Sequence, residues 1–544
     1  RSNANEEDNW NTSNAGRFET ALNVDRLNYK EVSKALNKVF NSYEKIGENS
    51  EVLIQKYVSN VKLSGVLFSC DLNTGSPYFS INYDLSSSTD TVTSGKGKNL
   101  KNIIVSRLHS SYFQKLDEDL KLVVTASKEI MDLLKFEKLD IEFALDFDDK
   151  VHIFQVRPIL VDHSNFNFNS KTFKNEINLA SKDFVNYQKK SNTIVGDKTI
   201  YSNMSDWNPA EMIGTHPSPL ALSLYKYIIT DENWAIQRAE FGYKNLVGIP
   251  LLKSFCGQPF IDLRASFNSF IPKKLPKLTS RRIVNTYIEY LSKNIDLHDK
   301  IEFDVAFTIW TPDLFEIAKK RFLKYRVLDD DILLLEKELK KITINSFRFL
   351  LGKYEEIDKL TKNFESLNRS KINDLDKAIN YLKDCKKFGS LLFAHAARAG
   401  FMSVNLLNYF ERSEAISRSR KMQFLESISI ISTEFEDDVC CYSKTKLLKK
   451  YGHLRPGTYD INQRAYWEIP EIFSKNKIQK KKGIRKINFK FLKKEKDKIN
   501  DFLTQLGAQI SFDEFIFFLK AGIKNREFFK YLFTKNVSFA LDYF

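Results

Sequence analysis

Three side chains with complementary chemistry are spaced to come together in the stretch "LDIEFALDFDDKVHIFQVRPIL", residues 139–160. The stretch is typical of two strands around an acidic turn, and we place a two-residue turn at Asp148-Asp149. Counting outward puts Glu142 opposite Gln155 and Arg157 on the same face. A carboxylate can hold Mg²⁺, and a guanidinium can bind a phosphate through two parallel hydrogen bonds. The alternative is an ordinary surface ion pair between Glu142 and Arg157.

The predicted hairpin has one polar and one apolar face. Phe147 faces Lys150, and alternation with a period of two assigns the remaining side chains. The polar face is predicted to hold Glu142, Ala144, Asp146, Val151, Ile153, Gln155 and Arg157. The apolar face is predicted to hold Ile141, Phe143, Leu145, His152, Phe154 and Val156.

The first residues of the chain, "RSNANEEDNWNTSNAGRFETALNV", carry further polar groups. Arg1 and the acidic pair Glu7-Asp8 precede a small-residue loop, in which Gly16 permits a tight turn. Such a loop can present backbone N–H groups to phosphate oxygens, so Gly16 is a candidate phosphate-binding position. β-rich runs over residues 52–58 and 64–84 separate this loop from the hairpin.

The elements that must position these groups divide the chain into parts. Residues 1–164 alternate short β-rich runs with helical stretches. Residues 165–200 are polar and rich in Asn, Lys and Ser, so we predict a linker that leads into a helix. Residues 201–544 are dominated by amphipathic helical patterns. The sequence therefore predicts an α+β protein, with a largely α-helical domain after the sheet-containing one.

The composition limits the class of protein. At 544 residues the chain is too long for one compact core. A formal charge of +15 admits a nucleic-acid-binding protein, but Lys is enriched along the whole chain rather than on one basic face. Five cysteines without metal-binding spacing favour a reduced, cytoplasmic protein without a structural zinc. No apolar run is long enough to span a membrane, so we expect no membrane partner. No RNA- or DNA-binding motif appears, so we expect no nucleic-acid partner either.

Motifs in the first domain follow one another in a characteristic order. They are Arg1-Ser2-Asn3-Ala4, Glu7-Asp8, Ala15-Gly16-Arg17-Phe18, Gln55, Ser64-Gly65-Val66, Asp71, Asp140-Ile141-Glu142-Phe143 and Gln155-Val156-Arg157-Pro158. In this order the motifs resemble the nucleotide-binding domain of the phosphoenolpyruvate synthase and pyruvate phosphate dikinase superfamily, which has an ATP-grasp fold. The resemblance implies ATP and Mg²⁺ as ligands of residues 1–164.

The resemblance also implies a role for individual residues. Arg1 and Arg157 would contact the ATP phosphates and, with Glu142, would be catalytic. Glu142 and Gln155 would bind Mg²⁺ and phosphate. The segment around Gln55 would line the adenine pocket.

Two departures from the family pattern alter the predicted site. The family has a further lobe before the Arg-Ser motif, with a phosphate-contacting Lys, so we expect this lobe to be missing from the chain. The usual Gly-rich loop is replaced by residues 83–98, where Ser94, Gly95 and Lys96 could still bind an anion.

The helical domain contains candidates for a small acceptor's site. In "SFCGQPFIDLRASFNSFIP", Gln258 precedes Asp262 and Arg264, which alternate with other residues. An Asp and an Arg on one face suit the ammonium and the carboxylate of an amino acid. A structural network of salt bridges is the alternative.

The segment "YGHLRPGTYDI", residues 451–461, adds His453 and Arg455 as acceptor candidates. It is similar to a segment of rifampicin phosphotransferase and related synthases, although Thr458-Tyr459 replaces Gly-Glu, which argues against an antibiotic acceptor. Together with "SDWNPAEMIG" and "GQPFIDLRASFNSFIP", it most resembles the L-glutamine kinases of bacterial capsule phosphoramidate biosynthesis. This resemblance implies L-glutamine as the acceptor.

Dikinases of this superfamily pass the phosphoryl group through a histidine on a mobile domain. His395 lacks the Gly-Gly-x-Thr run that precedes such a histidine, and it continues a helical core pattern. His216 lies in a Pro-rich loop and also lacks this context. We therefore expect the phosphohistidine domain to be absent from this chain and to be its partner within one longer polypeptide.

The sequence thus predicts an ATP-dependent kinase of dikinase type. The pyrophosphoryl group of ATP would move to the carrier histidine, water would take the terminal phosphate, and the side-chain amide of L-glutamine would receive the remaining phosphoryl group. AMP, phosphate and phosphorylated glutamine would be the products. The alternatives are a dikinase with another small acceptor, a basic nucleic-acid-binding protein, and a folded piece that binds nucleotide without turnover.

Overall fold

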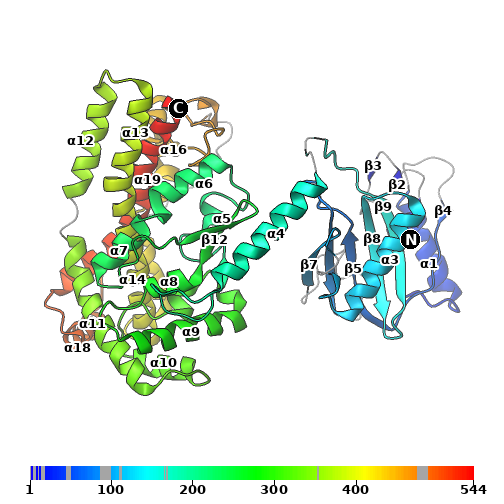
Figure 1. Cartoon of the computed structure of the whole chain (residues 1–544), viewed down its shortest axis with the longest axis horizontal. Coiled ribbons are helices and arrows are strands. Elements are labelled where there is room, and N and C mark those ends of the chain that lie inside the picture. The colour runs from blue at the N-terminus through cyan, green and yellow to red at the C-terminus, as the bar shows by residue number, and fades with distance from the viewer. Residues whose placement is uncertain are drawn as a thin grey trace. The chain divides into compact units, whose positions relative to one another are not determined.

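The computed structural model describes residues 2–3, 8–9, 12–13, 19–43, 51–85, 100–109, 113–164, 166, 169–351, 355–473 and 488–544. The chain divides into two compact units, Arg1–Asn178 and Leu179–Phe544, whose elements are labelled in Figure 1. The division falls inside helix α4 (Ser170–Tyr187), within the stretch predicted to lead from a linker into a helix. The predicted α+β class is confirmed, because the chain combines an antiparallel sheet with many helices.

The first unit contains a five-stranded antiparallel sheet with the strand order β7-β6-β5-β8-β9. Its strands are β5 (Val61–Phe68), β6 (Tyr78–Asp84), β7 (Leu100–Ser106), β8 (Leu139–Asp146) and β9 (Val151–Pro158). Before the sheet come β1 (Ser2–Asn3), β2 (Asp8–Asn9), β3 (Thr12–Ser13), α1 (Tyr29–Asn41) and β4 (Glu51–Val52). Helix α3 (Glu118–Leu134) lies between β7 and β8 in the chain.

Helix α3 packs on one face of this sheet. Because side chains alternate between the two faces of a strand, Leu67, Ile81 and Ile141 all point to the same face and form a buried cluster. Helix α3 contributes Val123 and Val124 to this cluster. Burial of each such side chain stabilises the unit by about 1.5–3 kcal/mol. The opposite face of the same strands then carries their polar side chains.

The hairpin of β8 and β9 has a different turn from the predicted one. Asp146 N–H donates to the Lys150 carbonyl (3.1 Å) around a turn in which Asp149 adopts a left-handed conformation with φ 57°. The Asp146 carboxylate accepts hydrogen bonds from the backbone N–H groups of Asp148 (3.0 Å) and Lys150 (2.9 Å). The predicted two-residue turn is therefore wrong, because the Asp146 side chain stabilises a longer one.

A bulge in β9 restores the register. Phe143 pairs with Ile153, but Glu142 pairs with Gln155, so Phe154 is the extra residue. The predicted pairing of Glu142 with Gln155 is confirmed. The predicted faces near the turn are wrong, since Val151 and Ile153 pack on the apolar core and His152 pairs with Ala144.

The second unit is largely helical. It has a small antiparallel sheet of β10 (Tyr201–Ser202), β12 (Gln258–Asp262) and β11 (Leu252–Phe255). Its first helices are α5 (Pro209–Met212), α6 (Pro219–Tyr225), α7 (Asn233–Phe241), α8 (Leu263–Ser269), α9 (Lys277–Lys293) and α10 (Leu314–Phe322). Next come α11 (Asp329–Leu351), α12 (Glu355–Arg369), α13 (Asp374–Asp384) and α14 (Leu391–Arg412). The last are α15 (Arg418–Glu426), α16 (Ile431–Cys441), α17 (Lys444–Tyr451), α18 (Lys493–Leu506) and α19 (Phe512–Tyr543).

Helices α14 and α19 approach each other closely at two glycines. A Cβ placed on Gly522 would lie 2.8 Å from the Ala399 carbonyl oxygen and 2.7 Å from Ser403 Oγ. A Cβ on Gly400 would lie 3.1 Å from the Gly522 carbonyl oxygen. Only glycine permits this backbone contact, which holds the last helix of the chain against the centre of the unit.

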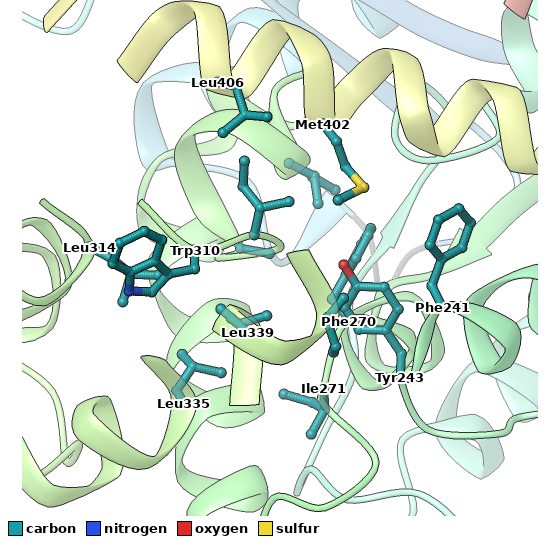
Figure 2. Packing of buried hydrophobic residues seen from close by; sticks show 14 of the residues in the cluster. Phe241, Tyr243, Phe270, Ile271, Trp310, Leu314, Leu335, Leu339, Met402 and Leu406 are labelled. Atoms are coloured by element: carbon teal, nitrogen blue, oxygen red, sulfur yellow. The ribbon is translucent and has the colours of Figure 1, made fainter. Parts of the chain in front are cut away.

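The main core of the second unit gathers side chains from several helices. Figure 2 shows Phe241 of α7, Leu335 and Leu339 of α11, and Met402 and Leu406 of α14 in this cluster. Apolar patterns predicted as helices within residues 201–544 thus bury a common interior. Among the described residues, no helix combines the length and apolar character that a membrane crossing requires.

Candidate functional site

The sheet of the first unit has a polar face opposite α3. One row across its strands consists of Asn102, Asn82, Val66, Glu142 and Gln155 in register. The next row on the same face consists of Ile104, Ser80, Phe68, Asp140 and Arg157. We call these ten residues the polar face. Side chains directly opposite each other on neighbouring strands have Cβ atoms about 4.5–5.5 Å apart, so the rows bring distant residues into contact range.

Glu142 is the residue of the polar face whose carboxylate is available to a ligand. Its side chain is half-buried, and within the described part of the chain its carboxylate makes no hydrogen bond or ion pair. The ion pair with Arg157 that the sequence left open is therefore not formed. Arg157 instead lies opposite Asp140, two pairs along the ladder from the Glu142–Gln155 pair. The three predicted side chains do share one face of the sheet.

Two fixed side-chain contacts flank this centre. Asn102 Nδ2 donates to Asn82 Oδ1 at 2.6 Å on the β6–β7 side. His152 Nε2 lies 2.7 Å from Asp146 Oδ2 at the turn end of the hairpin. The hydrogen bond with His152 and those from the backbone of Lys150 and Asp148 lower the pKa of Asp146. Sequence reasoning missed this pair because it placed His152 on the apolar face.

The donor set around Glu142 fits a magnesium ion that also binds phosphate. Mg²⁺ takes oxygen ligands and is usually held by one or two carboxylates together with phosphate oxygens and water. The Glu142 carboxylate without a partner, beside the amide of Gln155, offers oxygens of this kind. Within the ranges that the structure describes, no group of three or more His, Cys, Asp or Glu side chains could hold a metal by itself.

The other residues predicted to contact the nucleotide lie before β5 or outside the described residues. Gln55 is exposed in an extended segment just before β5. Arg1, Gly16, Ser94 and Gly95 lie outside the described residues, so their proposed contacts with phosphate remain predictions.

Asp262 and Arg264, which were predicted to bind the acceptor, both make structural contacts. Residues Leu263–Ser269 form helix α8 and not an alternating strand. Asp262 caps this helix, since its carboxylate accepts from the N–H groups of Arg264 (3.0 Å) and Ala265 (3.2 Å). The Thr199 hydroxyl donates to the same oxygen at 2.6 Å. Both predicted side chains are buried. Among the described residues the Asp262 carboxylate forms no salt bridge, so the salt-bridge network that was the alternative is not seen at this residue.

Arg264 binds the end of helix α4. Its guanidinium donates to the carbonyl oxygens of Tyr187 (2.8 Å) and Lys189 (2.9 Å). Cations at a helix C-terminus satisfy carbonyl groups that have no partner within the helix. The third residue predicted in this stretch, Gln258, is partly exposed, and its Nε2 lies 2.8 Å from His216 Nε2.

His453 is buried and also has a structural partner. Its Nε2 lies 3.3 Å from the Tyr531 carbonyl oxygen, and its ring packs edge-on against Tyr531. Burial lowers the pKa of His453 to about 4, helped by Lys535 and opposed by the hydrogen bond to Tyr531. The ring is therefore neutral near pH 7, and its role in binding the acceptor stays a prediction.

Arg455 ties the segment after α17 to the last helix. Its Nε donates to Ser538 Oγ (2.8 Å) and its Nη1 donates to the Gln463 carbonyl oxygen (2.6 Å). Its Nη2 also pairs with the Asp542 carboxylate. The guanidinium lines a pocket, but its own donors are engaged by the protein.

A buried ionic network in the second unit escaped sequence reasoning. Arg238 donates to Asp206 (2.9 Å) and Glu302 (3.4 Å), and Arg398 donates to the other Glu302 oxygen. Burial raises the pKa of Asp206, although Arg238 opposes this effect. The guanidinium of Arg238 also lies 4.0 Å from the centre of the Phe270 ring. The partners are up to 96 positions apart in the chain, so no local pattern could have indicated them.

His395 also belongs to the interior of this unit. It lies on α14, is 1% exposed, and its Nε2 lies 2.5 Å from Glu240 Oε2. Such burial agrees with its interpretation as a core residue rather than a phosphoryl carrier that must reach another domain.

A scan against models of known protein families finds no match for this chain, and a search of curated proteins finds no similar sequence.

Proposed function

We propose that this chain binds ATP with Mg²⁺ on the polar face and belongs to an ATP-dependent phosphotransferase of dikinase type. One observation carries the proposal: Glu142, without a partner within the described residues, lies opposite Gln155, and Arg157 follows on the same face. Oxygen donors beside a guanidinium suit a metal-bound triphosphate. The antiparallel sheet, covered by α3 on its other face, is compatible with an ATP-grasp domain.

Each residue of this centre has a role in the proposal. Arg157 would bind phosphate oxygens and stabilise the charge that develops during phosphoryl transfer. Glu142 and Gln155 would hold Mg²⁺, which neutralises phosphate charge when bound. Phosphoryl transfer depends mainly on positioning and on charge stabilisation, and these side chains provide both.

We propose L-glutamine as the acceptor. Its side-chain amide nitrogen would form the new N–P bond and lose a proton, as the phosphorus–nitrogen bond to the carrier histidine breaks. The carrier would belong to a phosphohistidine domain of the same polypeptide. Water would receive the terminal phosphate of ATP, so that AMP and phosphate leave. The motifs of residues 202–544 quoted above support this acceptor.

Nucleotide binding by the chain tests the first half of the proposal. We expect Glu142→Gln to weaken MgATP binding at least tenfold, as the loss of about 1.5–3 kcal/mol from a charged contact implies. Without Mg²⁺, the variant and the wild type should bind ATP alike, whereas Arg157→Ala should weaken binding in both conditions. Isothermal titration calorimetry measures both affinities.

Glu129→Gln provides the matched control. This exposed residue lies on α3, which covers the other face of the sheet, so its replacement should leave MgATP binding unchanged. Equal Mg²⁺ dependence in Glu142→Gln and wild type would remove the proposed metal site.

Turnover by the complete polypeptide tests the second half. We expect AMP to form from MgATP only when L-glutamine is present, and ³¹P NMR separates AMP, phosphate and a phosphoramidate. Formation of AMP with pyruvate or another acceptor instead of L-glutamine would keep the dikinase reaction and replace its substrate. Salt-dependent nucleic-acid binding without ATP binding would contradict the proposal altogether.

A further inference from the structure

A pocket of about 320 Å³ opens beside the C-terminal turn of α19. Its wall includes Leu541 and Asp542 from α19, and Arg455, Arg464, Trp467 and Glu468 from the segment that follows α17. This volume lies at the small end of the range of about 300–1,000 Å³ that is usual for ligand pockets. All of these residues belong to the second unit.

The inner wall of the pocket is held rigidly. Arg455 is 9% exposed and joins the segment to α19 through Ser538 and Asp542. Trp467 packs edge-on against Phe539, with ring centres 5.1 Å apart. A wall fixed in this way costs little ordering entropy when a ligand binds.

The mouth of the pocket has charged groups that are more exposed than Arg455 and have fewer protein contacts. Arg464 is exposed, and within the described residues its guanidinium makes no hydrogen bond or ion pair. Glu468 uses Oε2 to accept from the Ala465 N–H (2.6 Å) and lies 4.0 Å from Arg455. Asp542 keeps a 32% exposed side chain while it pairs with Arg455. The pocket thus offers one unpaired cation and two accessible carboxylates.

The charges of the wall select the kind of ligand. Two guanidinium groups and two carboxylates cancel formally, so the pocket does not attract a polyanion such as ATP, which the carboxylates would repel. A zwitterion places its carboxylate on a guanidinium and its ammonium on a carboxylate. The Trp467 ring and Leu541 provide an apolar wall for methylene groups.

We propose that this pocket binds the free α-amino acid that accepts the phosphoryl group. Arg464 holds the α-carboxylate through two parallel hydrogen bonds, and Asp542 and Glu468 hold the α-ammonium. The amino-acid side chain extends along Trp467. The inference rests on the proposed function for the identity of the amino acid, L-glutamine, and on the pocket for its location.

The test uses Arg464→Ala, because this side chain has no structural partner to lose. We expect the wild-type chain to bind L-glutamine, and the variant to bind it at least tenfold more weakly, by calorimetry or by ligand-detected NMR. Arg464→Lys should recover part of the affinity, since a lysine keeps the charge but not the fork. Glutaramic acid, which lacks the α-ammonium, should bind the wild type at least tenfold more weakly than L-glutamine.

Two controls separate the pocket from the rest of the molecule. Lys449→Ala removes an exposed cation on nearby α17 and should leave L-glutamine binding unchanged. MgATP binding, measured on the same samples, should not change in Arg464→Ala. If the wild type binds L-glutamine but not ATP, the result would contradict the proposed function and still support the assignment of the pocket. Equal binding of L-glutamine by Arg464→Ala and wild type, or none by either, would overturn the pocket instead.

Discussion

The polar residues of the two units differ in what they contact. On the polar face of the first unit, Glu142 is half-buried and has no partner within the described residues. In the second unit, Asp262 caps a helix, Arg264 binds carbonyl groups, and Arg398 pairs with Glu302. The residue types are the same, but these charged groups of the second unit are already engaged by the protein, whereas the Glu142 carboxylate is not.

Burial explains this difference. A charged group enclosed by helices must be paired, because an isolated buried charge costs several kcal/mol. Glu142 is only half-buried on the polar face, so its carboxylate keeps contact with water and can bind a ligand without first losing a protein partner. Residues that maintain the fold are therefore paired in the interior, and residues that can act on a substrate are at least partly exposed and lack a protein partner. Four measurements test this distinction.

The largest effect is expected at the buried ionic network. Arg398→Ala removes a fully buried guanidinium and leaves Glu302 with Arg238 as its remaining charged partner. We expect a loss of about 3–5 kcal/mol in the free energy of unfolding, measured by urea denaturation. Arg412→Ala, which breaks the more exposed pair with Asp313, should cost at most about 1 kcal/mol. Similar losses in both variants would contradict the distinction.

His453 gives the next effect, and it depends on pH. The pKa of His453 is about 4 in the folded chain against an ordinary value of 6.5, so between these values the unfolded chain binds a proton that the folded chain does not. Stability from this residue is complete above pH 6.5 and falls as the pH drops toward 4, by about 3 kcal/mol in all. His453→Gln should remove this part of the acid sensitivity in unfolding curves taken from pH 4 to 8. An unchanged pH slope would show that His453 titrates normally.

A smaller loss is expected at the cap of α8. Asp262→Ala removes the acceptor for Thr199 and for the first turn of the helix, so we expect about 1–3 kcal/mol less stability. Asp262→Asn keeps an acceptor oxygen and should lose less. Neither change should alter the affinity for L-glutamine, measured by calorimetry. A selective loss of glutamine binding at full stability would restore Asp262 to the acceptor site.

The smallest effect on stability is expected at the candidate nucleotide site. Glu142→Gln breaks no contact within the described residues, so the free energy of unfolding should stay within about 0.5 kcal/mol of wild type. The same variant is expected to bind MgATP weakly. Thermal denaturation with and without MgATP compares the two properties in one experiment. A destabilised Glu142→Gln would mean that this carboxylate maintains the sheet instead.

The sequence predicted the central pair of the hairpin but not the path of the chain around it. Alternation over "LDIEF" and "IFQVRP" is local, so the pairing of Glu142 with Gln155 could be inferred. The longer turn depends on the Asp146 carboxylate, and the bulge at Phe154 compensates for it. The longer turn shifts the pairing of β8 and β9 by one residue, and the bulge shifts it back before Glu142 and Gln155. Between the turn and the bulge, side chains such as His152 and Ile153 therefore lie on the faces opposite to those predicted.

The sequence did not indicate the structural contacts of Asp262 and Arg264 for a related reason. The residues alternate in the sequence, but the apolar residues around them favour a buried helix, α8, in which all seven side chains lie inside the unit. The partners of Arg264 belong to the end of α4, more than 70 positions earlier. A pattern of polar residues cannot show that Arg264 binds carbonyl groups when those groups are that distant.

The sequence by itself determined the local elements: strands with a period of two, amphipathic helices, and one face of a hairpin with three complementary groups. These depend on neighbouring residues and on backbone geometry, which the order of side chains fixes. Only the tertiary structure decided which polar groups were already paired and which remained available. Pairing depends on contacts between residues far apart in the chain, such as Arg398 with Glu302 and Arg455 with Asp542, and these exist only after the helices pack.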